Sequence, residues 1–239
     1  MRGQLTRQTL AGREGWVYLP PRALRSAPCP AVYVFGGEGP LLAQVMGMLE
    51  KDFGVSVQPF ALVSVPGTDW WDDYSPWPAP ALPGTGVFTG GYPKTLAWLL
   101  GSVLPEAEAR FGLAAGDRTL VGYSLAGLAA LSTLYATDAF GGVGCLSGSL
   151  WFEGWMDYAR THQPRRLDAR VYLSLGREEP RTRNPVMAHV GEDAQAMADL
   201  LASQLAQPGW VRMVWNKGGH ADGLIGRYER ALRALMAMA

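Results

Sequence analysis

Hydrophobic residues follow two alternating patterns along the chain, which predict strands and helices in turn. Short continuous apolar runs are typical of strands in a sheet that is covered on both faces. Apolar residues spaced three and four positions apart indicate helices with one buried face. The predicted strands are 31–35, 55–65, one that starts near 118 and ends at Gly122, 142–146, 169–175 and 210–215, and the predicted helices are 41–51, 92–111, 125–136, 184–207 and 221–239.

The order of these elements predicts the fold class. Segments 4–10 and 15–19 read as two short strands of an opening hairpin, after which strands and helices alternate to residue 239. This alternation is typical of an α/β fold, a three-layer αβα sandwich with a mostly parallel central sheet. The chain has no internal repeat and no linker, so we expect one domain over residues 1–239. Two stretches, about 67–91 and 148–168, are long for connections and are expected to be loop insertions beside the functional site.

Composition narrows the class of function. Of the 239 residues, 48% are hydrophobic and 18% charged, which is typical of a globular protein. The formal net charge is zero, so we expect neither a nucleic-acid partner nor attachment to a membrane surface. The first residues lack the apolar core of a signal peptide, and no apolar run approaches the roughly 20 residues of a membrane span. These features predict a soluble, cytoplasmic enzyme.

The two cysteines, Cys29 and Cys145, fit no metal-ligand spacing. We expect Cys29 to be a loop thiol and Cys145 a buried strand residue, although a disulfide between them stays open. No pattern in the sequence predicts a metal or a cofactor.

A serine stands where a buried strand turns into an apolar helix. The strand ends at Gly122, the chain turns through Tyr123 and Ser124, and the helix begins at Leu125. Such a turn lifts the serine hydroxyl above the sheet, and the helix N-terminus offers free N–H groups to an anion. Because strand and helix nearly touch, small residues are needed two before and two after the serine. Gly122 meets the first need, and Ala126 stands at the second in place of glycine, which weakens the motif without breaking it. We therefore predict that Ser124 is a nucleophile; the alternative is a serine that only caps the helix.

An activated serine needs a base within hydrogen-bond reach, and the chain has three histidines. His162 lies in a polar stretch and His189 inside a predicted helix, so both are expected to be non-catalytic. His220 follows the last predicted strand, at the sheet edge where open α/β sheets bind ligands. The sequence therefore predicts His220 as the base.

The acid that orients the histidine is expected after the preceding strand, which ends at Gly176. Glu178 and Glu179 are the carboxylates in that loop, and Glu179 is favoured. The alternatives are Glu178, or a site that works with serine and histidine alone.

A developing oxyanion needs backbone N–H donors. The N–H of Leu125 follows the nucleophile, and the glycine-rich loop after strand 31–35 brings Gly37 and Glu38 to the same edge. Glycine permits close approach of the backbone to the oxyanion. The loop lacks the G-x-G-x-x-G spacing of a dinucleotide site, and a simple turn is the remaining alternative.

Aromatic residues concentrate in the two expected insertions. They are predicted to form the walls of a pocket for an apolar or aromatic substrate, although packing of the loops against the body explains them equally well. The residues are Trp70, Trp71, Tyr74, Trp77, Trp151 and Trp155.

Several motifs together resemble the esterase D-like esterases of the α/β-hydrolase superfamily, a group that includes siderophore esterases of the enterobactin and bacillibactin type. The resemblance covers nearly the whole chain. The family often has Asp-Gly after the third strand and glycine two after the serine, where this chain has Gly36-Gly37 and Ala126. The motifs are Tyr33-Val34-Phe35-Gly36-Gly37, Asp73-Tyr74-Ser75-Pro76, Gly122-Tyr123-Ser124-Leu125-Ala126-Gly127, Ser147-Gly148-Ser149-Leu150-Trp151 and Gly219-His220.

These observations predict a serine hydrolase that cleaves carboxylic esters of small molecules through a Ser-His-Glu triad and an acyl-enzyme. A siderophore trilactone esterase and an acyl thioesterase are alternatives that use the same site. A non-catalytic binding module on a hydrolase scaffold and a nicotinamide-dependent oxidoreductase are alternatives from other classes. The sequence leaves the natural substrate and the oligomeric state open.

Overall fold

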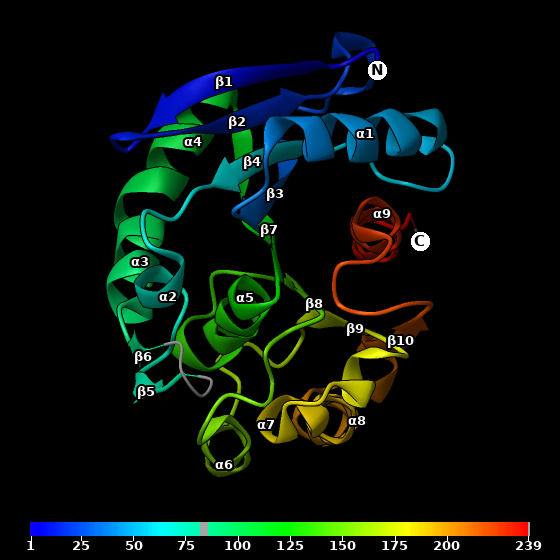
Figure 1. Ribbon diagram of the computed structural model, residues 1–239. Helices are drawn as coiled ribbons and strands as arrows, with labels where there is room; N and C mark the ends of the chain where they lie inside the picture. Colours follow the sequence, from blue (N-terminus) through cyan, green and yellow to red (C-terminus); the bar gives the residue numbers. More distant parts are fainter. Residues whose placement is uncertain (82–85, 239) are drawn as a thin grey trace.

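The apolar runs form one central sheet. The computed structural model describes residues 1–81 and 86–238. Within these residues the main sheet has eight strands in the order β1-β2-β4-β3-β7-β8-β9-β10 (Figure 1). The contacts of β1 with β2 and of β2 with β4 are antiparallel, and all later neighbours are parallel. The strands are β1 (Gln4–Leu10), β2 (Arg13–Leu19), β3 (Cys29–Phe35), β4 (Ala61–Val65), β7 (Leu113–Tyr123), β8 (Gly142–Leu146), β9 (Arg170–Gly176) and β10 (Val211–Asn216).

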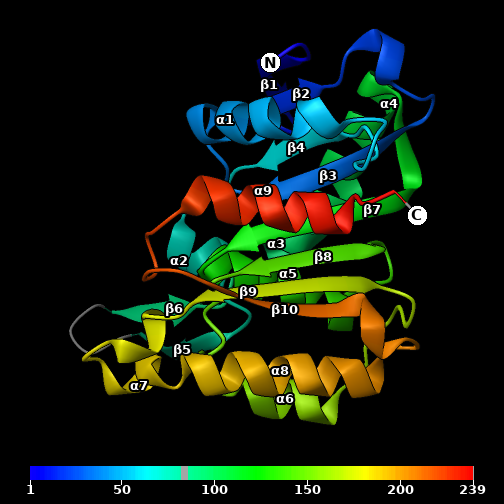
Figure 2. The same cartoon turned by 90° about the vertical axis from the view of Figure 1, so that its right-hand side faces the viewer.

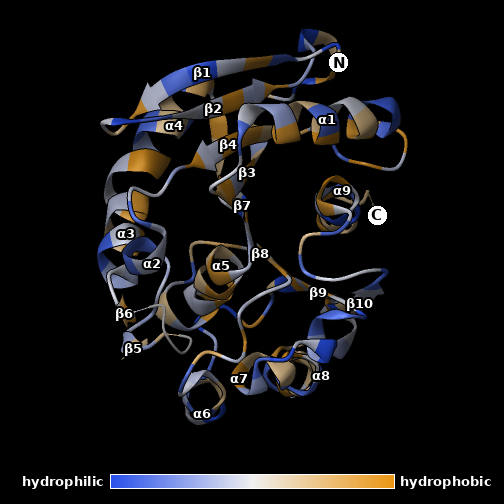
Figure 3. Ribbon diagram, viewed as in Figure 1, coloured by the Kyte–Doolittle hydropathy of each residue, from blue (hydrophilic) through white to orange (hydrophobic). Residues whose placement is uncertain are grey.

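Helices cover both faces of this sheet, which confirms the predicted α/β-hydrolase type of architecture. Helices α1 and α9 lie against one face, and the others pack against the opposite face or at its end (Figures 1 and 2). Hydrophobic and hydrophilic residues alternate along α1 and α9 (Figure 3), and the apolar ones are buried against the strands. The longer helices are α1 (Gly39–Leu49), α3 (Tyr92–Trp98), α4 (Leu104–Phe111), α5 (Leu125–Ala136), α6 (Trp155–Thr161), α8 (Val190–Gln204) and α9 (Leu224–Leu235).

Segment 55–65 is strand only over β4, so its prediction was too long. Gly54 has a φ of 77° and turns the chain, and Val57 makes only isolated bridges with Phe53 and Ala237. Pro59 lacks the N–H that a ladder requires. Apolar content alone therefore extended the predicted strand through a turn.

Two predicted helices depart from one regular α-helix. Segment 92–111 is helical throughout but contains a π-helical stretch, Leu99–Val103, between α3 and α4. Pro105, near the start of α4, removes one backbone donor and crowds the preceding turn, which accounts for the wider stretch. Segment 184–207 divides at His189 into α7 (Pro185–Ala188) and α8, so His189 lies between two helices rather than inside one.

The final predicted helix, 221–239, is shorter than expected: α9 begins after Gly223, which has a φ of 65°. Residue 239 lies outside the described residues. The two cysteines are free and buried. Cys29 begins β3 and is not the loop thiol that was expected, whereas Cys145 lies in β8 as predicted.

The two expected insertions contact each other beside α5. Segment 67–91 contains α2 (Trp70–Asp73), β5 (Pro78–Pro80) and β6 (Val87–Thr89), and its residues 82–85 lie outside the described part. Segment 148–168 contains α6. The ring of Phe88 lies 5.0 Å from that of Phe152, and the ring of Trp77 lies 5.7 Å from it. Across the described residues, no helix combines the length and the apolar character needed to cross a membrane.

The junction of β7 and α5 leaves no room for a side chain at Gly122. A Cβ atom there would lie 2.0 Å from the carbonyl oxygen of Ala126, which is backbone and cannot rotate away. Gly127 is also confined, since its Cβ would lie 3.1 Å from the carbonyl oxygen of Gly122. The close approach of strand and helix, which the sequence predicts, therefore depends on the missing side chain of Gly122.

We expect Gly122→Ala to lower the free energy of unfolding by at least about 2 kcal/mol, because overpacking against backbone forces the junction apart. Gly47→Ala in α1 is the matched control, since nothing lies within 4 Å of its added Cβ. That change is expected to stabilise the helix by about 0.5–1 kcal/mol. Urea unfolding followed by circular dichroism measures both, and equal stability of the two variants would contradict the packing argument.

Candidate active site

The candidate residues gather at one edge of the sheet because parallel strands carry their carboxyl ends there. Open α/β sheets bind ligands at this edge. Strands β3, β7, β8, β9 and β10 end there, and the residues that follow them are Gly36, Ser124, Ser147, Glu179 and His220, respectively, within a few positions of each strand end.

Ser124 occupies a strained turn. Its φ is 59° and its ψ is −126°, a conformation that residues with a side chain rarely adopt. Its backbone N–H donates to the carbonyl of Leu146 at 2.9 Å. Its carbonyl accepts from the N–H groups of Gly127, Leu128 and Ser149. Because both backbone groups are bonded to neighbouring elements, the surrounding structure holds the strained conformation in place.

A chain of hydrogen bonds joins Ser124, His220 and Glu179. The Nε2 atom of His220 lies 3.0 Å from Ser124 Oγ, and its Nδ1 lies 2.8 Å from Glu179 Oε2. A carboxylate accepts only, so Nδ1 carries the hydrogen and Nε2 accepts from the serine hydroxyl. The His220 side chain is 44% exposed and that of Glu179 only 5%. The imidazole can therefore meet a ligand while its carboxylate partner stays buried.

The other candidates for base and acid lie elsewhere. His162 stacks on Tyr158, with its Nδ1 at 2.8 Å from the carbonyl oxygen of that residue. His189 is exposed beside Glu192. Glu178 is exposed and precedes the short turn that carries Glu179, so Glu179 is the glutamate of this pair that meets His220.

Glu179 is surrounded by donors that keep it ionised. Burial would raise the pKa of this carboxyl, but hydrogen bonds from His220, the Gly176 N–H, Ser147 and Arg227 outweigh it and lower the pKa to about 2. The Gly176 N–H donates at 2.7 Å and Ser147 Oγ at 2.8 Å. The carboxylate is therefore charged across the neutral pH range and held in one orientation.

Arg227 also belongs to the site, although the sequence did not predict it as a site residue. Its side chain is 0% exposed and its Nη1 donates to Glu179 Oε1 at 2.8 Å. The same nitrogen donates to Ser147 Oγ and, at 3.1 Å, to the hydroxyl of Tyr123, while Nη2 donates to the carbonyl of Gly219 at 2.5 Å. The Tyr123 hydroxyl in turn donates to the carbonyl of His220. One guanidinium thus ties the loops of the serine, the acid and the histidine together.

The sequence carried a signal for Arg227. In α9 the positions of Leu224, Tyr228 and Ala231 form a helical stripe that faces the sheet, and Arg227 lies within it. A charged residue on a buried stripe requires a buried partner. The partner itself could not be identified from the sequence, since Glu179 is on another element.

The predicted oxyanion donors lie beside the hydrogen-bonded residues Ser124 and His220. Leu125 is the first residue of α5, so its N–H has no acceptor within the helix. Gly36 and Gly37 have φ values of 71° and 81°, which favour glycine. Gly37 and Glu38 line the same cavity as His220, of about 400 Å³.

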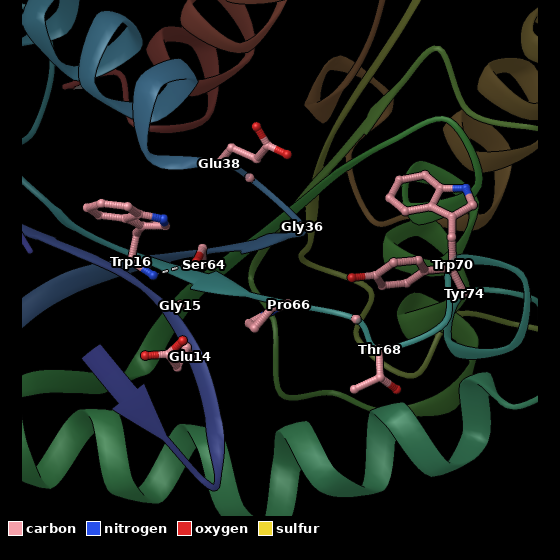
Figure 4. A pocket seen from close by; sticks show the side chains of 12 residues that line it. Glu14, Gly15, Trp16, Gly36, Glu38, Ser64, Pro66, Thr68, Trp70 and Tyr74 are labelled. Atoms are coloured by element: carbon pink, nitrogen blue, oxygen red, sulfur yellow. Dashed lines mark hydrogen bonds between the residues drawn. The ribbon is translucent and has the colours of Figure 1, made fainter. Parts of the chain in front are cut away.

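Two cavities share His220 in their linings. The 400 Å³ cavity is mainly apolar and includes Leu41 and Trp70. A larger one of about 510 Å³ shares Gly36, Gly37, Glu38 and Trp70 with it. Figure 4 shows Trp16 and Glu14 on one side of this larger cavity, with Trp70 above Tyr74 on the other. A smaller cavity of about 240 Å³ is also lined by His220.

The structure divides the six aromatic residues among separate places. Trp70 and Tyr74 line the cavity of Figure 4, and Trp151 lines the 240 Å³ cavity with His220. Trp71 stacks on Phe88, 4.9 Å between ring centres. Trp77 and Trp155 line a further cavity that His220 does not reach.

The comparisons with known proteins agree with this architecture. A family model described as "Putative esterase" matches residues 11–211. The chain belongs to this esterase family. The match confirms the resemblance drawn from the sequence motifs. A relative from Bacillus subtilis (strain 168), the uncharacterized protein YbbA, is 29% identical to this esterase over 196 residues, which are 80% of this chain and 78% of the relative.

Solved structures share the fold of the esterase. An IroE-like serine hydrolase from Shewanella oneidensis superposes with a TM-score of 0.79 at 20% identity, over 98% of this chain and 80% of its own. The siderophore hydrolase EstB from Aspergillus nidulans gives 0.69 at 18% identity, over 98% and 94%. At 20% and 18% identity, these superpositions show a shared fold alone. In the described part of the esterase, no group of three or more His, Cys, Asp or Glu residues is arranged to hold a metal ion.

We expect Arg227→Met to lower the free energy of unfolding of the esterase by about 3–5 kcal/mol, because it leaves the buried Glu179 carboxylate without its cation. The double variant Arg227→Met/Glu179→Gln is expected to regain part of that loss, since the unpaired charge is gone. Urea unfolding of wild type, both single variants and the double variant gives the coupling. Strictly additive losses would contradict a direct interaction.

The depressed pKa of Glu179 predicts how stability depends on pH. Its ionised form stabilises the fold above the usual glutamate pKa of 4.5, and this contribution is lost as the pH falls through about 2. We expect the difference in unfolding free energy between wild type and Glu179→Gln to shrink by at most about 3 kcal/mol from pH 5 to pH 2. A difference that stays constant over this pH range would rule the argument out.

Proposed function

We propose that the protein hydrolyses carboxylic esters with Ser124 as the nucleophile, His220 as general base and acid, and Glu179 as the group that orients His220. The observation that carries this proposal is the chain of contacts at 3.0 and 2.8 Å, set at a strained turn at the carboxyl edge of the sheet. Membership of an esterase family supports the reaction class.

In the proposed reaction the Oγ of Ser124 forms a bond to the ester carbonyl carbon, and its proton passes to Nε2 of His220. The tetrahedral intermediate then breaks its bond to the alcohol oxygen, which leaves with that proton. A water molecule attacks the acyl-enzyme, again losing its proton to His220, and the carboxylic acid and free serine are released. Glu179 stays ionised and stabilises the imidazolium, consistent with its low pKa.

The negative charge of the intermediate requires donors at the carbonyl oxygen. We assign this role to the N–H of Leu125 and to that of Gly37 or Glu38. The position of Leu125 at the start of α5 supports its part, and the φ values of Gly36 and Gly37 support that of the loop. One such donor is typically worth a factor of about 10²–10³ in rate.

Two cavities that share His220 suggest that each receives one part of the ester. The 400 Å³ cavity is mainly apolar. The 240 Å³ cavity is lined by Trp151 and by the exposed residue Arg181. This difference favours a substrate with one apolar part and one polar part.

Siderophore ester hydrolysis is the second candidate. It is favoured by the fold likeness to the siderophore hydrolase EstB and by the indole of Trp151 beside His220, which suits a catechol ring. Thioester hydrolysis would use the same nucleophile. Relative kcat/KM values on a catecholate trilactone, an acyl thioester and p-nitrophenyl esters of increasing chain length separate these substrates.

Ser124→Ala is expected to reduce kcat on p-nitrophenyl esters by at least about 10³-fold and to abolish labelling by a fluorophosphonate probe, because the nucleophilic oxygen is removed. His220→Gln is expected to show a similar loss. His189→Gln is the matched control and is expected to keep wild-type turnover, since this side chain is 67% exposed beside Glu192.

Unchanged turnover in Ser124→Ala would refute the proposal. A wild-type protein that binds an ester but neither turns it over nor reacts with the fluorophosphonate would instead be a binding module on a hydrolase scaffold.

A further inference from the structure

A separate cavity lies between α9 and β10, the last strand of the sheet. It has a volume of about 340 Å³, within the range of small-molecule sites. Helix α9 packs on β8 and β9, and β10 extends beyond it without a helix in front of it (Figure 2). The lining of the cavity includes Tyr172, Arg212, Val214, Arg230, Arg233 and Ala234.

This cavity is distinct from the candidate active site. Neither Ser124 nor His220 lines it. Arg212 stands four residues before Asn216, the last residue of β10. At about 3.3 Å per strand residue, it lies roughly 13 Å back from the carboxyl edge where the candidate active site is built.

Three arginines line this cavity, and among the described residues no carboxylate does. Arg212 of β10 is paired in parallel register with Tyr172 of β9, so both side chains stand on the same face of the sheet. Arg230 and Arg233 are three residues apart on α9 and therefore share one face of that helix. Strand and helix thus direct their basic side chains into the space between them.

Only one of the three positive charges is balanced by carboxylates of the described residues. Arg233 donates to Glu229 at 2.7 Å and to Asp52 at 2.8 Å. Arg230, which is exposed, donates to the neutral side chain of Asn216 at 2.7 Å and has no ion pair in the described part of the chain. Arg212 is exposed too, and it forms neither an ion pair nor a hydrogen bond there.

Tyr172 adds a neutral donor to these cations. The residue is 2% exposed, and its hydroxyl has no hydrogen-bond partner among the described residues. The hydroxyl oxygen is nevertheless not closed off from solvent, so a ligand in the cavity can reach it. Burial raises the pKa of this hydroxyl, and the positive charges of Arg230 and Arg212 oppose that rise, since both guanidinium groups are near it. The hydroxyl is protonated at neutral pH and can donate.

We propose that this cavity binds the phosphate group of a small organic phosphate monoester. The two guanidinium groups without carboxylate partners match the two negative charges that such a group carries above its second pKa of about 6. Its three terminal oxygens can accept from Arg212, from Arg230 and from the Tyr172 hydroxyl. Val214 and Ala234 provide an apolar wall for the organic part.

Phenyl phosphate tests this proposal, since at about pH 8 it is a dianion with a small apolar part. Isothermal titration in about 50 mM salt is expected to show binding to wild type with a dissociation constant below about 1 mM. Benzoate has one negative charge and two acceptor oxygens, so it is expected to bind at least about 5-fold more weakly.

Variants locate the site. Arg212→Gln removes a charged donor and is expected to weaken binding of phenyl phosphate at least about 10-fold. Tyr172→Phe keeps the ring but removes the hydroxyl, and a loss of about 5- to 10-fold is expected. Arg181→Gln is the matched control and is expected to bind as wild type, because this exposed arginine lines the cavity of His220 instead. Circular dichroism establishes that each variant is folded.

Four results would overturn the proposal. The first is absence of binding to wild type at about 5 mM phenyl phosphate, and the second is wild-type affinity in Arg212→Gln or in Tyr172→Phe. Loss of binding in Arg181→Gln would assign the anion to the candidate active site. Arg212-dependent sedimentation with phosphatidylcholine vesicles that contain phosphatidate, without binding of phenyl phosphate, would assign the cavity to a lipid headgroup in place of a small molecule.

Discussion

The buried ion pair between Glu179 and Arg227 is the interaction on which the candidate site depends. Arg227 reaches from α9 to Tyr123 before the serine, to Ser147 after β8, to Glu179 after β9 and to the carbonyl of Gly219 before the histidine. A buried charge is tolerated only when paired and hydrogen-bonded. The pair therefore connects four loops through one guanidinium. These buried contacts join the loops at the base of the site, whereas the side chain of His220 is 44% exposed.

The strained backbone conformation of Ser124 is the second constraint, and neighbouring residues hold it in place. A positive φ in a non-glycine residue persists only where neighbouring structure enforces it. The hydrogen bonds of Ser124 with Leu146 and Ser149 provide this enforcement, and the packing at Gly122 prevents relaxation of the strand away from the helix. Leu146 is the last residue of β8, and Ser147 follows it directly. The end of β8 therefore both holds Ser124 in its strained conformation and contacts Glu179.

The sequence predicted the fold and most of the candidate site, for identifiable reasons. Buried parallel strands have continuous apolar runs, and topology then brings every loop after such a strand to one edge, so Ser124, Glu179 and His220 could be proposed from order alone. The order of the elements along the chain does not show which side chains of different elements contact each other. Arg227 lies in helix α9 and not in a loop that follows a strand. Its position on the apolar stripe of that helix was the one sign in the sequence that it is buried. Pro59 shows the same limit locally, since the apolar run continues through it while the strand begins only at Ala61.

The aromatic residues show why composition is a weaker guide than position. Trp151 and Trp155 are four residues apart, yet Trp151 faces the cavity of His220 and Trp155 the cavity beside Tyr92. The turn that separates them is set by two backbone hydrogen bonds, from Phe152 to Ser149 and from Trp155 to Phe152. It begins where the N–H of Ser149 donates to the carbonyl of Ser124. The route of this loop therefore starts at the contact with Ser124 and ends at the cavity that Trp155 lines. Since α5 is buried along nearly its whole length, the course of the two insertions that cover it decides which of their aromatic rings line which cavity.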